Sequence, residues 1–493
     1  MDVNSEAPGM PPAELEAPRS GGVLARQIAR YLPGMIVPAA VALASTAIFT
    51  RVLSAPEYGR FSLALGIAML VASGSGQWLR QSTSRFLPAA DTAREEAVVL
   101  ASAAYGLVLL TLALAVAGGA VLALRAWVIP GAAPELVSAS AAFAVATLLL
   151  QQLLALLSAQ QRAGRHSVYQ TAESVLRFGA ALVLVGRVPR GESLLWASAA
   201  ASAVLVPVLW RDVGLPSPAA ALRRGRELSS RLRAWAGYGV PMAGWFICAT
   251  LLEAADRYVI EWARGSAEVG IYSANYGLVV RAAGLVALPA VMAAHPLLIR
   301  AWERGAPGEA AWLLGQIVQR FIIAGLVACT LGWAFARDAA AVLGPEFRAG
   351  YRVIPLALAG LLLWHMGLYL HKPLEFHRRT RRMLALAGGA AALNLALNAA
   401  LVPVYGYLAA AWVTLASYAA YAAGAAVQGR RLLAWRFDWL PVAATAAGCV
   451  AWAAGAAALR EALGVAGVLA WAGGVSAAAL VFHLRARRAA RGG

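Results

Sequence analysis

Charged residues are scarce in this sequence. They make up 13% of its 493 residues, whereas a typical soluble domain carries about 25%. Hydrophobic residues account for 61%, and the mean hydropathy is +0.66. A water-soluble protein of this length needs far more polar surface, so the composition excludes a water-soluble fold.

Cysteine and lysine are also nearly absent. The three cysteines, Cys248, Cys329 and Cys449, lie inside apolar stretches and form no CxxC motif. This spacing suggests neither a disulfide framework nor a zinc site. Lys372 is the only lysine, so almost all of the 42 basic residues are arginine. We expect no metal centre and no cofactor.

The net charge of +18 raises the question of a nucleic-acid partner. The basic residues, however, recur at the ends of apolar blocks, as the positive-inside rule describes for membrane proteins. They do not alternate with aromatic residues in a polar domain, which nucleic-acid binding would require. We therefore expect no nucleic-acid partner.

Apolar stretches of about 20 residues, separated by short arginine-rich segments, dominate the chain. The sequence therefore predicts an all-α polytopic membrane protein with about 14 transmembrane helices. Arginines concentrate in alternate connections, beginning before the first span, so both termini are expected to be cytoplasmic. The expected spans are residues 32–50, 60–79, 97–124, 132–158, 167–186, 193–210, 236–260, 271–299, 313–335, 353–371, 383–402, 406–427, 439–459 and 464–483.

The longest polar interruption after the N-terminal tail divides the chain near its middle. It is rich in arginine and is predicted to be a basic cytoplasmic linker, with an amphipathic helix on the anionic leaflet as the alternative. The expected units are a disordered cytoplasmic tail (1–22), an N-terminal six-helix bundle (23–210), this linker (211–234), a C-terminal six-helix bundle (235–428), and two further transmembrane helices with a basic tail (429–493).

A weak internal repeat relates the two halves. The first half has Pro33, then Arg51, then the segment EYGRFSLALGI; the second has Pro241, then Arg257, then EVGIYSANYGL. Both copies begin at a cytoplasmic end, so they share one topology and the repeat axis should lie along the membrane normal. Two like bundles around a central cavity are a transporter architecture.

Four sequence blocks resemble, in order, the motifs of a known family. They are TRVLSAPEYGRFSLA (50–64), ADRYVIEWARGSAEVGIYSANYGL (255–278), VLGPEFRAGYRVIPLALAG (342–360) and ALNLALNAALVPVYGYLAAAWVTLASY (392–418). The family is the polysaccharide-transport branch of the multidrug/oligosaccharidyl-lipid/polysaccharide (MOP) flippase superfamily, which contains the O-antigen and exopolysaccharide flippases. The resemblance implies two six-helix bundles in a V around a central lumen, with two extra C-terminal helices.

The resemblance also implies a function. The expected protein is a flippase of the bacterial inner membrane, not an enzyme. It would move a polyprenyl-diphosphate-linked oligosaccharide across the membrane by alternating access, for cell-surface or exopolysaccharide biosynthesis. Its expected partners are this lipid-linked oligosaccharide and the membrane lipids. The sequence leaves open whether the last two helices bind a polysaccharide polymerase or only complete the bundle.

Such a substrate would lose its hydration in hydrocarbon, so a flippase needs a hydrophilic, cationic cavity. A charged side chain within the membrane is energetically costly, so its presence there indicates a functional role or a structural partner. Arginine suits phosphate because its planar fork makes paired, charge-assisted hydrogen bonds. The candidate substrate-binding arginines are Arg281, Arg177, Arg320, Arg257, Arg80 and Arg85.

Each arginine also has a structural interpretation. Arg80 and Arg85 stand at a helix end, where long basic side chains snorkel to the headgroups. Arg177 follows Glu173 by four residues, the spacing of a neutralising pair. Arg320 is close enough to its helix end to reach the headgroups. Arg281, about ten residues into its span, is favoured for the lumen.

Acidic and amide residues complete the set of candidates. Glu253 and Asp256 share one predicted helix face with Arg257, and two acids near one base can titrate or bind a cation. They are candidates for proton or sodium coupling, with a static salt bridge as the alternative. Amides suited to sugar contact are Asn275, Asn394 and Asn398, for which hydrogen bonding between packed helices is the alternative.

Two other functions stay open. A cation-coupled drug exporter of the same superfamily would be expected to use an acidic cavity, and the excess of arginine at depth argues against it. A membrane glycosyltransferase or polymerase generally needs a large outer loop or an acid pair for general acid–base work. The predicted outer loops are short and contain no catalytic constellation.

Overall fold

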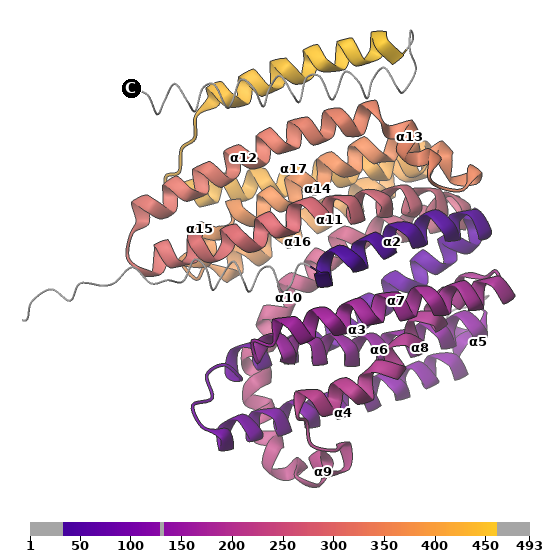
Figure 1. The fold of residues 1–493 in the computed structure, drawn as a ribbon, viewed down its shortest axis with the longest axis vertical. Coiled ribbons are helices and arrows are strands. Elements are labelled where there is room, and N and C mark those ends of the chain that lie inside the picture. Colours follow the sequence, from indigo (N-terminus) through magenta and orange to yellow (C-terminus); the bar gives the residue numbers. More distant parts are fainter. Residues whose placement is uncertain (1–32, 129–132, 461–493) are drawn as a thin grey trace, which may run out of the picture.

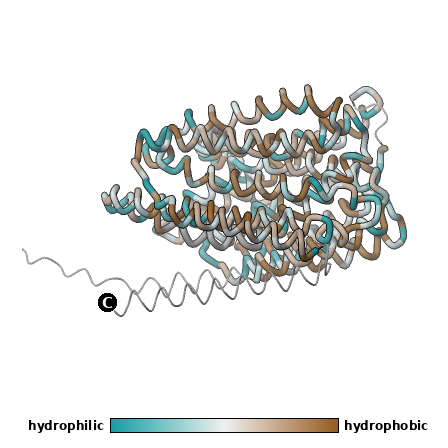
Figure 2. Tube along the Cα trace, turned by 90° about the horizontal axis from the view of Figure 1, so that it is seen from above, coloured by the Kyte–Doolittle hydropathy of each residue, from teal (hydrophilic) through white to brown (hydrophobic). Residues whose placement is uncertain are grey.

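The computed structural model describes residues 33–128 and 133–460, apart from the side chains of residues 241, 242, 245 and 284–296. The described ranges are built from helices and contain no strand. The predicted tail (1–22) and the last predicted span (464–483) lie outside them. Hydrophobic and hydrophilic segments alternate along the chain, with the hydrophilic ones gathered at the two ends of the helices (Figure 2). This is an all-α polytopic membrane protein, as predicted.

The first group of helices, which we call the N-terminal bundle, lies in the lower part of Figure 1, apart from its first helix, which lies at about mid-height. It consists of α2 (Pro33–Val52), α3 (Ala55–Phe86), α4 (Ala93–Ala123), the short α5 (Arg125–Val128), α6 (Pro134–Ala159), α7 (Ala163–Arg187) and α8 (Gly191–Val213).

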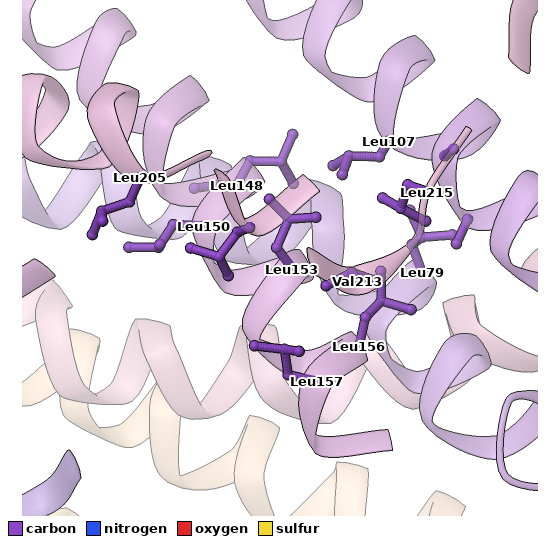
Figure 3. Close-up of a cluster of buried hydrophobic side chains, with 14 of the residues drawn as sticks. Leu79, Leu107, Leu148, Leu150, Leu153, Leu156, Leu157, Leu205, Val213 and Leu215 are labelled. Carbon is purple, nitrogen blue, oxygen red and sulfur yellow. The ribbon is translucent and has the colours of Figure 1, made fainter. Parts of the chain in front are cut away.

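Leucine side chains from several of these helices form the core of the N-terminal bundle. Leu79 of α3, Leu107 of α4 and Leu153 of α6 are fully buried, and they converge with further leucines of α6 and α8 (Figure 3). In a bilayer the lipid tails are as apolar as leucine, so such a core is stabilised by close van der Waals packing rather than by exclusion of water.

The second group, which we call the C-terminal bundle, lies above the first in Figure 1. It consists of α10 (Gly225–Arg264), α11 (Ser266–Glu303), α12 (Pro307–Ala334), α13 (Ala336–Ala341), the 3-10 helix η1 (Pro345–Arg352), α14 (Val353–Leu370), α15 (Lys372–Phe376), α16 (Thr380–Tyr405) and α17 (Tyr407–Arg430). The short α9 (Pro218–Arg223) joins the two groups, and a further helix, Trp439–Arg460, follows α17.

Eleven helices of the described residues are long and apolar enough to cross a membrane. Each of them covers one of the predicted spans. The seventh and eighth predicted spans fall on α10 and α11, which are 40 and 38 residues long and contain the side chains left undescribed. A bilayer requires only about 20 residues, so both helices have the necessary length.

The segment expected to be a linker (211–234) contains the end of α8, the whole of α9 and the beginning of α10. Its surface carries an ion pair between Arg224 and Glu227 at 2.8 Å. From there α10 continues as one helix from the N-terminal bundle into the C-terminal bundle (Figure 1). Near its start, Trp235 stacks on Phe86 of α3, and its backbone carbonyl accepts a hydrogen bond from Ser82.

Helices α3 and α11 cross at very short range near their first turns. A Cβ atom on Gly59 would lie 2.0 Å from the carbonyl oxygen of Ser266, and one on Gly270 would lie 2.0 Å from that of Ala55. Only glycine allows two backbones to approach so closely. These glycines occupy corresponding places in the two copies of the repeat, so the repeat supplies both halves of this contact.

Candidate functional site

The end of the molecule where α2 ends and α11 begins holds the two bundles together. Glu346 of η1 accepts a hydrogen bond from the backbone N–H of Ala55 at 2.9 Å, in the first turn of α3. In the other direction, the backbone N–H of Gly344 donates to Thr50 Oγ1 at 3.1 Å. Together with the Gly59–Gly270 crossing, these bonds form a contact that we call the end clasp.

A second polar group lies inside the C-terminal bundle, around Asp256. This carboxylate is fully buried on α10. It accepts hydrogen bonds from the hydroxyl of Tyr272 on α11 and from Thr414 on α17, the latter at 3.4 Å. Three helices therefore meet on one carboxylate. A buried carboxylate of this kind needs such donors because it has lost its water.

Arg257 and Glu253 extend this group toward the surface of α10. The Arg257 guanidinium lies 4.0 Å from Asp256, donates to the backbone carbonyl of Glu253 at 3.0 Å, and stands over the ring of Tyr276 at 5.3 Å. Glu253 is exposed, and His365 of α14 is among the side chains that act on it electrostatically. The two predicted acids therefore differ: Asp256 is sealed in the bundle and Glu253 is accessible.

Aromatic side chains continue the polar group through the bundle. Tyr272 stacks on Tyr276 with ring centroids 5.5 Å apart, and the Tyr276 hydroxyl lies 3.5 Å from that of Tyr418. Further along, the Tyr421 hydroxyl lies 2.6 Å from Nδ1 of His371. Tyr272 and Tyr276 are both fully buried, and no local sequence pattern marks these tyrosines as one group.

Asn394 and Asn398 are fully buried one turn apart on α16. Asn398 Nδ2 donates to Asn394 Oδ1 at 2.9 Å. Among the described residues, Asn394 Nδ2 and Asn398 Oδ1 have no hydrogen-bond partner. Helix α16 packs against α10 and α17, the helices that carry Asp256 and Thr414. The pair therefore has one unused donor and one unused acceptor inside the bundle.

Asn275 has a different environment. It is fully buried on α11 and donates to the carbonyl oxygens of Ile271 at 2.9 Å and Phe347 at 2.8 Å. It therefore ties η1 to α11 just behind the end clasp. Asn275 therefore forms a hydrogen bond between packed elements, which is the alternative to sugar contact considered for these amides.

Arg80 of α3 faces a cavity between the two bundles. Its guanidinium donates to Gln77 Oε1 at 3.1 and 2.5 Å and to the side-chain oxygen of Gln151 on α6. The cavity, of about 230 Å³, is lined by Gln77 and Arg80 on α3 and by Phe246, Ile247 and Thr250 on α10. The described residues that line it include one cation, one amide and two hydroxyls (Ser73 and Thr250), and no carboxylate.

The other candidate arginines are spread over both bundles. Arg281 on α11 is half-buried, and one of its terminal nitrogens has no hydrogen-bond partner among the described residues. Arg177 lies 3.7 Å from Glu173, as its spacing predicted. Arg85 is exposed and stands 4.4 Å over the ring of Tyr238, and Arg320 is exposed on α12. The structure therefore brings Arg80 to the cavity between the bundles and Arg257 to Asp256.

Comparison of the fold with solved structures finds several membrane transporters. A structure described as "Lipid II flippase MurJ, inward closed conformation" matches with a TM-score of 0.68 at 11% identity, over 85% of this chain and 90% of that one. "Crystal structure of MATE in the bent conformation" matches with a TM-score of 0.56 at 14% identity, over 87% and 97%. An outward-facing multidrug resistance MATE transporter of the MOP superfamily matches with a TM-score of 0.56 at 14% identity, over 86% and 96%.

The fold is shared with these MurJ and MATE structures. No family model and no curated protein matches the sequence itself. The comparison therefore shows a shared fold, while membership of the superfamily and of its polysaccharide-transport branch both stay predictions. The cavity at Arg80 and the end clasp both lie between the two bundles.

Proposed function

We propose that this protein is a flippase that moves a polyprenyl-diphosphate-linked oligosaccharide across the bacterial inner membrane by alternating access. The observation that carries the proposal is the cavity between the bundles, where Arg80 is held by two glutamines. Amide partners fix the guanidinium without neutralising it, so the cavity keeps a positive charge for a diphosphate. The fold shared with the MurJ and MATE structures supports the proposal, and so does the structural neighbour described as a lipid II flippase.

The orientation and division of the chain form part of this proposal. We infer that both termini are cytoplasmic, so the end clasp closes the outer end of the transporter. We further propose that residues 23–210 and 235–428 are the two moving bundles, that residues 211–234 connect them, and that 429–493 adds two helices and a basic tail. The flippase would then open outward by breaking the end clasp.

Cation coupling is the second element of the proposal. Asp256 lies between α10, α11 and α17 and collects two hydroxyl donors, and Glu253 next to it is accessible. A proton or sodium ion that binds at these acids would change how α10 packs against α11 and α17. Because α10 passes through both bundles, a change in its packing acts on both of them. Glu253 and Asp256 are therefore the residues proposed for coupling; Asn394 and Asn398 lie on α16, which packs against α10.

A cation-coupled drug exporter is the second candidate function. The MATE neighbours and the accessible Glu253 favour it. A drug exporter for organic cations would be expected to place acids in the cavity between the bundles, whereas the lining at Arg80 contains none. The charge of this cavity favours the flippase.

We expect Arg80→Ala to reduce transport of the lipid-linked oligosaccharide about tenfold to a hundredfold, the range for loss of hydrogen bonds to a charged group. The measurement is the sidedness of lipid-linked intermediates in cells depleted of the protein and complemented with each variant. Intermediates should accumulate on the cytoplasmic face with Arg80→Ala. Arg187→Ala, which removes an exposed arginine at the end of α7, is the matched control and should restore transport. If Arg80→Ala transports the lipid as well as wild type, the positively charged cavity is not part of the transport mechanism.

A further inference from the structure

A separate cavity lies between the C-terminal bundle and the Trp439–Arg460 helix. Its volume is about 630 Å³, within the usual range of small-ligand pockets. It is located where α12 ends and α14 begins, the same end of the molecule as the end clasp but outside the two bundles' shared cavity. Much of its wall is apolar, formed by Pro355, Leu356, Leu408, Ala453, Ala456 and Ala457.

Three arginines line this cavity: Arg337 of α13, Arg352 of η1 and Arg460. Arg460 donates to Asp338 at 2.7 Å and to the carbonyl oxygen of Ala334 at 2.6 Å, so its charge is balanced. Within the described ranges, neither Arg337 nor Arg352 forms an ion pair with a carboxylate. Among the described residues, the cavity therefore has two positive charges that no carboxylate balances.

Tyr351 holds these two arginines together. Their guanidinium groups lie 5.1 Å (Arg337) and 5.8 Å (Arg352) from its ring centroid. Both also donate to its hydroxyl, at 3.4 Å and 3.2 Å. A neutral hydroxyl orients the guanidinium groups without cancelling their charge. Two guanidinium groups oriented at one site can together form several charge-assisted hydrogen bonds to a phosphate.

Tryptophans indicate the depth of the cavity in the membrane. Trp333 and Trp412 line it, yet they are 62% and 57% exposed. Tryptophan is enriched at the level of the lipid headgroups, where its ring is in contact with both apolar and polar surroundings. The cavity thus faces the bilayer at headgroup level, with arginines for a phosphate and apolar walls for the chains below it.

We propose that this cavity binds an anionic phospholipid, with its phosphate on Arg337 and Arg352 and the start of its acyl chains against Leu356, Leu408 and Ala456. The lipid bridges η1 and α13 of the C-terminal bundle to the Trp439–Arg460 helix. It is a structural lipid rather than the transported substrate, so its binding does not depend on the proposed flippase activity. Apolar walls and exposed tryptophans favour a lipid over a free phosphate ion.

The test uses the purified full-length protein in detergent and native mass spectrometry. Phosphatidylglycerol and phosphatidylcholine with identical acyl chains are added separately, and the retained lipid is counted. The double variant Arg337→Gln/Arg352→Gln removes the two unbalanced charges. The double variant Arg187→Gln/Arg190→Gln removes two exposed arginines from the same end of the N-terminal bundle and controls for the change in net charge. Inorganic phosphate and glycerol phosphate are added as competitors without acyl chains.

Wild type and the control are expected to retain phosphatidylglycerol in preference to phosphatidylcholine. The Arg337/Arg352 variant should bind phosphatidylglycerol about 30-fold more weakly, the change expected for two basic residues beside an anionic lipid. Phosphatidylglycerol should also raise the unfolding temperature of wild type but not of this variant. Equal retention of both lipids, or unchanged binding by the variant, would overturn the proposal. Displacement of the lipid by inorganic phosphate at equal concentration would assign the cavity to free phosphate instead.

Discussion

Replacing Gly59 with alanine is expected to open the end clasp and to stop the transport cycle from returning to the closed state. The new Cβ atom would lie 2.0 Å from the Ser266 carbonyl oxygen, whereas non-bonded heavy atoms prefer about 3.5–4.0 Å. Helices α3 and α11 must then separate by roughly 1.5–2 Å. This separation strains the Glu346–Ala55 and Gly344–Thr50 hydrogen bonds, which lie beside the crossing. Gly270→Ala should have the same effect, because its Cβ atom would contact Ala55 from the other helix.

Distances between spin labels measure this opening. Labels at positions 51 and 348, exposed residues on opposite sides of the clasp, report the separation in a background whose three cysteines are replaced by alanine. Both glycine variants should shift the distribution to longer distances and lose transport. Gly179→Ala on α7 is the control, because a Cβ atom there has nothing within 4 Å. An unchanged distance in Gly59→Ala and Gly270→Ala would show that the clasp does not control this end.

Asp256→Ala is expected to destabilise the C-terminal bundle by about 3 kcal/mol, the cost of removing one partner from a buried charge pair. The substitution leaves the hydroxyls of Tyr272 and Thr414 without their acceptor and the Arg257 guanidinium without its nearest carboxylate. Thermal unfolding in detergent should show a lower melting temperature, and transport should be lost. Asp256→Asn keeps an acceptor oxygen, so its loss of stability should be smaller than that of Asp256→Ala.

The substitution Glu253→Gln tests cation coupling without a large expected change in the stability of the protein. Glu253 is exposed and its side chain accepts no hydrogen bond within the described ranges, so the melting temperature should stay close to that of wild type. If Glu253 and Asp256 couple transport to a cation, this variant should no longer respond to an imposed proton or sodium gradient. Gradient-driven transport that equals wild type in Glu253→Gln would remove Glu253 from the coupling proposal.

The sequence predicted the membrane-spanning helices well because their signal is local. Each span is a run of apolar residues bounded by arginine, so α6 or α12 can be recognised from about 20 neighbouring residues. The repeat also placed Gly59 and Gly270 in corresponding positions. Its chemical consequence, the contact between α3 and α11, needed the structure because it depends on how the two helices cross.

The parts that the sequence did not reveal are contacts between distant residues. Glu346 accepts a hydrogen bond from Ala55, 291 positions away, and no periodicity marks such a pair. Asn275 and Asn394 are the same residue type in similar apolar helices, yet Asn275 ties η1 to α11 while Asn394 keeps an unpartnered amide nitrogen. Arg337 and Arg352 lie in a short predicted loop, and their shared partner, Tyr351, is evident only in three dimensions.

The most direct measurement of the central claim is translocation by the purified protein in proteoliposomes. A polyprenyl-diphosphate-linked oligosaccharide is placed in one leaflet, and its arrival in the other is followed with a glycan-modifying enzyme that cannot cross the membrane. Wild type and Arg187→Ala should move the lipid, and Arg80→Ala should move it about tenfold to a hundredfold more slowly. Failure of wild type to move this lipid, together with export of a hydrophobic organic cation from the same vesicles, would contradict the flippase assignment and support the drug exporter.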